Sequence, residues 1–226
     1  MENVKSFFDS FKEFIWDIIG YLVPGSYILI LLSFCVNHDY YIRSSLEVGL
    51  ENFSTIAFVI SSYILGYLTH GVGCLKEKLL GKYSYTKKIE SRVSTRKAYI
   101  LSKELLSKVF KENGITEDLG NSTVRDLRSI AMSFIPEHDH KIYTFTFRSD
   151  LSSQAGNISF IIGFLGLIST AIPKNIMEIF LVDKAHLLIY ICLIISYLFF
   201  RETRNRFYNI SISVPFSIYS AVAIRQ

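Results

Sequence analysis

The amino-acid sequence predicts an all-α integral membrane protein with four transmembrane helices and a small helical cytoplasmic insertion between the second and third spans. Half of the residues are apolar, and they are concentrated in four long blocks rather than spread at helical or strand spacing. A basic, polar stretch, residues 76–148, separates the first pair of blocks from the second. Together these observations predict two transmembrane hairpins joined by a segment that lies in water.

The predicted organisation has five parts along the chain. Phe7, Phe11 and Phe14 share one helical face of the first part, as expected for a helix that lies at the membrane surface. The parts are an interfacial amphipathic helix over 1–17, a transmembrane hairpin over 18–75, a cytoplasmic basic helical segment over 76–150, a second hairpin over 151–200 and a cytoplasmic tail over 201–226.

The first hairpin contains two uncharged runs, 18–36 and 53–75, each long enough to cross a hydrocarbon core of ~30 Å. Pro24 and Gly25 lie inside the first run. A proline within a helix frees a backbone carbonyl and bends the helix. The sequence leaves two interpretations of this pair open, a packing kink near the membrane surface and a gating hinge.

The second hairpin is predicted from apolar runs over 153–172 and 182–200, with Gln154 and Asn157 at the entrance of the first of these. None of the four spans has a carboxylate or a basic residue in its core. Ion-coupled carriers usually need such groups to relay protons or sodium ions. The sequence therefore argues against a carrier of that kind.

Each hairpin also carries a stripe of small or polar residues at near-helical spacing. Such stripes let helix backbones approach closely, so we expect helix-packing faces, within one subunit or between copies in a homo-oligomer. His70 is expected to be a hydrogen-bonded interfacial histidine, with a pH-sensing or pore-lining role as the alternative. The stripes are Ser62, Gly66 and His70 in the second span and Ser159, Gly163 and Gly166 in the third.

The distribution of positive charge predicts the orientation of the chain. Residues 76–148 hold 15 of the 24 Lys and Arg residues, whereas the two short loops between spans hold three. Positively charged segments stay on the cytoplasmic side of a membrane. We therefore expect both termini and the central segment to lie in the cytoplasm.

Periodic apolar positions predict helices in the central segment. One helix is expected over 91–112, with Asn113–Gly114 as its stop signal. A second is expected to be capped by Asn121 or Ser122 and to end at Pro136. So short a segment buries only a marginal core by itself, and we expect it to pack against the membrane ends, another subunit or a partner.

The same segment is the main candidate for interactions. Its near-membrane lysines are expected to contact anionic lipid headgroups, and an acidic cytosolic protein is the second interpretation. Direct nucleic-acid binding is disfavoured, because no nucleic-acid motif is present and stacking aromatics are not interleaved with the charges. The candidate contact residues are Lys82, Lys87, Lys88, Arg92 and Arg96.

The sequence contains no catalytic or cofactor-binding signature of the nucleophile-elbow, phosphate-loop, dinucleotide-binding or zinc-protease type. The cluster 137–140 (Glu-His-Asp-His) has metal-ligand residue types, but no motif places further ligands, and we interpret it as a solvated loop. Cys35, Cys74 and Cys192 lack C-x-x-C spacing and are interpreted as buried thiols. We expect a non-enzymatic protein without cofactor or metal.

Two short stretches remain ambiguous in conformation. Residues 143–147 (Tyr-Thr-Phe-Thr-Phe) alternate strictly between aromatic residues and threonine, which suggests a brief extended segment before the third span. In the tail over 209–222, apolar residues occupy every second position from 210 to 218, but apolar residues also form a helical stripe from Ile210 to Val222. Pro215 would restrict an extended tail to a sheet edge. In either conformation its apolar side chains need a surface that covers them.

Three stretches carry a resemblance to a known family. They are 17–25 (Asp-Ile-Ile-Gly-Tyr-Leu-Val-Pro-Gly), 62–68 (Ser-Tyr-Ile-Leu-Gly-Tyr-Leu) and 200–207 (Phe-Arg-Glu-Thr-Arg-Asn-Arg-Phe). They resemble small multi-span proteins of bacterial anti-phage operons, and the four-span layout is similar to that of the membrane subunit of the Kiwa system. The resemblance implies an oligomeric bacterial inner-membrane sensor that restrains or recruits a cytosolic effector.

Three hypotheses of different classes follow from the sequence. The first is a membrane sensor or anchor that docks a cytosolic protein through residues 76–148 and the tail. The second is an oligomeric pore or membrane-disrupting effector assembled through the small-residue faces. The third is a membrane enzyme or small transporter, which the absence of motifs disfavours.

Overall fold

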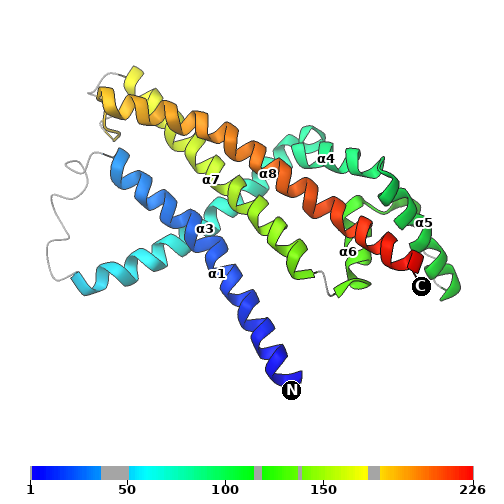
Figure 1. The fold of residues 1–226 in the computed structure, drawn as a ribbon. Helices are drawn as coiled ribbons and strands as arrows, with labels where there is room; N and C mark the ends of the chain where they lie inside the picture. The colour runs from blue at the N-terminus through cyan, green and yellow to red at the C-terminus, as the bar shows by residue number, and fades with distance from the viewer. Residues whose placement is uncertain (1, 37–50, 115–118, 137–138, 173–178, 226) are drawn as a thin grey trace. The chain divides into compact units, whose positions relative to one another are not determined.

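The computed structural model describes residues 2–36, 51–114, 119–136, 139–172 and 179–225, and within these ranges the chain is all-α (Figure 1). Four of its helices are long and apolar enough to cross a membrane, and shorter helices lie between the second and third of them. The predicted fold class is thereby confirmed. The helices are α1 (Glu2–Cys35), α3 (Glu51–Leu80), α4 (Tyr85–Ser94), α5 (Lys97–Glu112), α6 (Val124–Ser133), α7 (Asp139–Ala171) and α8 (Lys184–Arg225).

The described chain divides into two compact units. Unit 1 comprises Met1–Lys76 and Leu151–Arg201, and unit 2 comprises Glu77–Asp150 and Glu202–Gln226. Helices α3, α7 and α8 each contribute residues to both units. The central segment and the tail, which are far apart in the sequence, therefore belong to one folded body.

In unit 1, α1 crosses α3 at a point where both helices carry glycine (Figure 1). A Cβ atom at Gly25 would lie 1.6 Å from the carbonyl oxygen of Ser62. A Cβ atom at Gly66 would lie 1.8 Å from the carbonyl oxygen of Tyr21. The two backbones are thus in direct contact, and only glycine fits at either position.

The α7–α8 pair of unit 1 packs around one buried tyrosine. A Cβ atom at Gly163 would lie 2.9 Å from the Tyr190 carbonyl oxygen, and one at Gly166 would lie 2.4 Å from the Tyr190 ring. The Tyr190 side chain is fully buried, and its hydroxyl donates to the carbonyl oxygen of Leu181 at 2.8 Å. Glycine on α7 therefore makes room for a large ring on α8.

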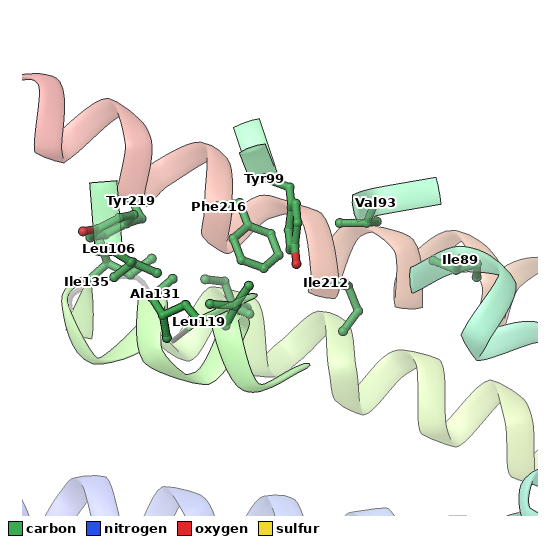
Figure 2. Packing of buried hydrophobic residues seen from close by; sticks show 12 residues of the cluster. Ile89, Val93, Tyr99, Leu106, Leu119, Ala131, Ile135, Ile212, Phe216 and Tyr219 are labelled. Atoms are coloured by element: carbon green, nitrogen blue, oxygen red, sulfur yellow. The ribbon is translucent and has the colours of Figure 1, made fainter. Parts of the chain in front are cut away.

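Unit 2 has a hydrophobic core of its own, to which α4, α5, α6, the first turns of α7 and the last part of α8 all contribute (Figure 2). Each helix presents its apolar side chains at three- and four-residue spacing, so that they share one face. At the centre, the Tyr99 ring meets the Phe216 ring edge-on, with centroids 5.0 Å apart. The core includes Ile89, Val93, Tyr99, Leu106, Leu127, Ala131, Ile142, Ile212, Phe216 and Tyr219.

The tail is helical throughout its described length, as part of α8, which resolves the ambiguity over 209–222. Pro215 lies inside the helix and has no N–H group, so the carbonyl of Ser211 loses its intrahelical partner. Arg128 of α6 replaces that partner, because its Nε donates to the Ser211 carbonyl oxygen at 2.9 Å. The tail keeps its helix across a proline because another helix satisfies the freed carbonyl.

Three local predictions for the central region were wrong. The predicted helix over 91–112 is two helices, α4 and α5, since Arg96 adopts an extended conformation between them. The N-cap of α6 is Thr123 rather than Asn121 or Ser122, because Thr123 and Asp126 form a reciprocal capping box. Residues 143–147 are helical within α7, where Ile142 is buried in the core, and are not extended.

Candidate functional site

The outward face of α4 is basic. Its buried stripe has i, i+3, i+7 spacing, which leaves the remaining positions of the helix facing away from the core. Lys87, Lys88 and Arg92 occupy those positions and are exposed. The buried stripe consists of Thr86, Ile89 and Val93.

Helix α5 carries a groove on its surface, with a volume of about 610 Å³. Its lining residues include three lysines, one glutamate and Ile100, whose side chain is 47% exposed. A surface of this kind suits an acidic ligand that also presents an apolar group. The lining residues are Ser94, Tyr99, Ile100, Lys103, Glu104, Ser107, Lys108 and Lys111.

A carboxylate at the end of α3 fastens three segments of unit 2, an arrangement that we call the Glu77 junction. Arg204 of α8 donates from Nη2 to Glu77 Oε1 at 2.6 Å. Thr86 of α4 donates from its hydroxyl to Glu77 Oε2 at 2.7 Å, and the Ser84 hydroxyl donates to the same oxygen. The start of α4 and the beginning of the tail are thereby held at the end of α3.

Glu90 forms a second junction of the same design between α4, α6 and α8. Its Oε1 accepts from Arg125 Nε at 2.6 Å and from the Tyr208 hydroxyl at 2.5 Å. Burial alone would lower the pKa of the Arg125 guanidinium, but its hydrogen bond to Glu90 and its interactions with the charges of Glu90 and Tyr208 together raise that pKa. The carboxylates of Glu77 and Glu90 thus each connect different helices of unit 2.

The structure separates the basic residues that the sequence grouped together. Lys87, Lys88, Arg92 and Arg96 are all exposed, but Arg96 also donates from Nη2 to Asn209 Oδ1 of the tail at 3.1 Å. The side chain of Lys82 lies outside the described part of the chain. Arg96 therefore holds the tail, and the exposed trio on α4 remains open to a partner or lipid.

The small-residue faces predicted in the spans contact other helices of the same chain. Ser62 and Gly66 lie against α1, and Gly163 and Gly166 lie against α8. The Ser159 hydroxyl is 2.8 Å from the Tyr27 hydroxyl. His70 is exposed and meets the Tyr21 ring edge-on, with centroids 6.0 Å apart.

Pro24 and Gly25, predicted as a kink or hinge, are both buried within α1 at the crossing with α3. The Ser62 hydroxyl at this crossing is fully buried and has no hydrogen-bond partner among the described residues. The pair therefore lies at the tightest contact of the hairpin. Residues 2–17 form the first part of α1, which continues into the first span, and the side chains of residues 1–14 and 17 lie outside the described part.

Polar side chains of α7 bind α3 in a way that sequence reasoning missed. Gln154 and Asn157 are buried, and Gln154 Oε1 accepts from the Thr69 hydroxyl at 3.1 Å. Lys76 Nζ donates to Asn157 Oδ1 at 2.8 Å and lies 5.5 Å from the centroid of the Tyr197 ring. The sequence did contain a signal for these contacts, because two side-chain amides at the entrance of a span need hydrogen-bond partners where water is excluded.

The opposite ends of α1 and α8 in unit 1 are also tied by polar contacts. His186 lies between two acceptors, with Nε2 3.0 Å from the Phe34 carbonyl oxygen and Nδ1 2.8 Å from Asp183. The Leu181 N–H donates to the Cys35 carbonyl oxygen at 2.8 Å. Asp183 also accepts from the backbone N–H of His186 at 2.8 Å, as an aspartate at the start of a helix commonly does. An aspartate three residues before a histidine was therefore the sequence signal that could have predicted this contact.

The part of the chain that the structure describes contains no group of three His, Cys, Asp or Glu residues that could hold a metal ion. Glu137 and His138 of the predicted loop lie outside that part. The cysteines are free thiols, and Cys35 is buried, but Cys74 and Cys192 are exposed on the surface of the spans, contrary to prediction. Lipid-facing positions accept a thiol because it behaves as a small apolar group.

Comparison with known proteins adds no family to this picture. No family model, curated protein or solved structure matches the chain. The arrangement of its own residues therefore carries the functional argument. Chemically, the charged groups of unit 2 do two things: two carboxylates fasten helices, and the exposed lysines and arginines present a positive surface.

Proposed function

We propose that this chain is a non-enzymatic anchor and sensor subunit of the bacterial inner membrane, with both termini and unit 2 in the cytoplasm. Unit 2 would dock and regulate a cytosolic protein. The observation that carries the proposal is the assembly of the central segment and the tail into one folded body with its own core and a basic outer surface. A segment that only connects two spans would need neither a hydrophobic core nor a basic surface.

The proposed docking surface is formed by Arg92 on α4 and the groove on α5. Its positive charge favours an acidic partner, because charged surfaces steer association and set specificity. The exposed Ile100 beside Lys103 and Lys108 offers the apolar contact that such interfaces need at their centre. The cytoplasmic placement follows the excess of Lys and Arg in this region.

The continuity of three helices supports a sensing role. Helices α3, α7 and α8 each contribute residues to both units, so a signal from the spans would have a continuous helical path to unit 2. The resemblance of the spans to proteins of anti-phage operons supports a role in defence, with the partner as effector. Oligomeric pore formation has less support, since the small-residue faces are already in contact within one chain.

Site-specific photo-crosslinking in living cells tests the docking surface. A photoreactive amino acid at Ser107, in the groove, should give one discrete crosslinked product, while the same residue at Leu198, which is 58% exposed on the apolar part of α8, should give none with a cytosolic protein. Charge reversal at Arg92, Lys108 and Lys111 should abolish that product at unchanged expression. A product that survives the reversal would show that the basic surface does not mediate docking.

A further inference from the structure

The lipid-facing stripe of α3 continues past the end of the apolar span. Exposed apolar side chains follow one another at seven- and four-residue spacing from Leu68 through Leu75 to Leu79, so they share one face of the helix. Leu79 is the most exposed of the three, at 78%. It lies one turn, ~6 Å, beyond Leu75, which is the depth of the headgroup region of a bilayer.

Exposed lysines flank this apolar end along the chain. Lys78 is exposed beside Leu79 on α3. Gly81, with φ +50, ends the helix, and the Glu77 junction then holds the start of α4 at the end of α3. Lys87 and Lys88 directly follow Thr86 of that junction in the sequence, and both are exposed.

An aromatic side chain completes the cluster. Tyr83 lies in the turn between α3 and α4 and is 71% exposed. Tyrosine is enriched where membrane meets water, since its ring is apolar and its hydroxyl is polar. The exposed Leu79 and Tyr83 side chains are therefore of the kinds that suit the glycerol and upper acyl region of a lipid.

We propose that Lys78, Leu79, Tyr83, Lys87 and Lys88 form a binding site for an anionic phospholipid. The ammonium groups bind the phosphate of the headgroup, and the two apolar side chains contact the glycerol and upper acyl chain. A protein occupant is disfavoured because Leu79 continues the exposed apolar stripe of α3 by one helical turn. The site is distinct from the docking surface on α5 and does not depend on it.

Fluorescence quenching in vesicles tests the site with the full-length chain. A single tryptophan at position 79, Leu79→Trp in a Trp16→Phe background, reports on lipids within contact distance. Vesicles of phosphatidylcholine would contain the same small mole fraction of brominated phosphatidylglycerol or brominated phosphatidylcholine. We expect stronger quenching by the anionic lipid, since each lysine strengthens association with an anionic surface by about fivefold.

A matched pair of variants separates this site from general charge effects. Lys78→Gln, Lys87→Gln and Lys88→Gln together should reduce quenching by brominated phosphatidylglycerol to the level of brominated phosphatidylcholine. The equivalent substitutions at Lys103, Lys108 and Lys111 on α5 should leave quenching unchanged while they weaken partner capture. Five of the six side chains are exposed and Lys103 is half-buried, and circular dichroism should report the same helix content in each variant.

Two outcomes would overturn the proposal. Equal quenching by the two brominated lipids would show that Leu79 meets bulk lipid without selection for the headgroup. Loss of the preference on addition of soluble glycerol phosphate would assign the site to a free phosphate ester rather than to a membrane lipid. Persistence of the preference in glycerol phosphate, together with its loss in the Lys78, Lys87 and Lys88 variant, is the result that the proposal requires.

Discussion

The two units of this chain differ in the kind of packing that stabilises each of them internally. Unit 1 relies on glycines that bring backbones into contact, at the crossing of α1 and α3 and around Tyr190. Unit 2 relies on large buried side chains such as Leu106, Phe216 and Tyr219. Lipid is as apolar as leucine, so the hydrophobic effect does not drive spans together, and close packing of the helices must stabilise unit 1 instead. In unit 2, by contrast, the hydrophobic effect in water favours burial of apolar surface. The units should therefore fail in opposite ways, one when atoms are added and the other when atoms are removed.

Removal of a large core side chain from unit 2 should have the largest effect on stability. Phe216→Ala is expected to lower the free energy of unfolding of this unit by about 3–5 kcal/mol, because the cavity has no side chain to fill it. Ile100→Ala on α5, where the side chain is 47% exposed, is the matched control and should cost less than about 0.5 kcal/mol. Hydrogen exchange of the backbone amides, followed separately in α4–α6 and in the spans, measures both. Equal effects of the two substitutions would mean that the core described around Phe216 does not form.

Addition of one methyl group should destabilise unit 1. Gly66→Ala is expected to cost about 1–3 kcal/mol or more, because its Cβ would lie 1.8 Å from the Tyr21 carbonyl oxygen and the helices must separate. Gly71→Ala on the same helix is the control, since no atom lies within 4 Å of its Cβ position. Thermal unfolding in detergent measures the difference. A stabilising or neutral Gly66→Ala would contradict the close crossing of α1 and α3.

The contrast between the units also explains what the sequence could and could not predict. Four uncharged apolar runs and a basic middle were sufficient to predict the fold class, because candidate spans are recognised by their length and apolar composition. The spacing of Ser62 and Gly66 predicted a packing face, but spacing does not tell which helix covers it. The neighbour of that face is α1, which only the structure shows.

Predictions within unit 2 were weaker because they depended on contacts between distant segments. The apolar positions of the tail suited a strand as well as a helix, and Pro215 only restricted a strand to a sheet edge without deciding between the two conformations. The helix is retained because Arg128, far away in the sequence, satisfies the Ser211 carbonyl. Glu77 and Glu90 were likewise missed as junctions, since their partners Arg204 and Tyr208 lie in the tail.

The Arg128 contact can be tested through its dependence on the proline. Arg128→Met should destabilise unit 2 by about 1–3 kcal/mol, because it leaves the buried carbonyl of Ser211 without a donor. In a Pro215→Ala background, alanine supplies the missing N–H, and the same Arg128→Met substitution should cost about 1 kcal/mol less. Chemical denaturation of the four proteins of this cycle measures the coupling. Equal costs in both backgrounds would show that Arg128 acts only through Thr146 or through its charge.

The capping box of α6 should give the smallest effect, and it is local to unit 2. Thr123→Ala removes the side chain that caps the helix and should cost about 1 kcal/mol. Hydrogen bonds from Thr123 hold the pKa of the Asp126 carboxyl below its usual value. The stability contributed by Asp126 is therefore present above its unfolded pKa of about 3.9 and is lost as the pH falls through the lower folded value. Acid unfolding followed by circular dichroism should lose this component in Asp126→Asn, and an unchanged acid profile would contradict the capping box.

The central claim is that four helices cross the membrane and leave unit 2 in the cytoplasm. Cysteine labelling tests it most directly, with Ser91→Cys on the exposed face of α4 in a background without Cys35, Cys74 and Cys192. A maleimide that does not cross membranes should leave Cys at position 91 unmodified in intact spheroplasts and modify it in inverted inner-membrane vesicles, with Val182→Cys showing the reverse pattern. Modification at position 91 in intact spheroplasts would place unit 2 outside the cytoplasm and contradict the account.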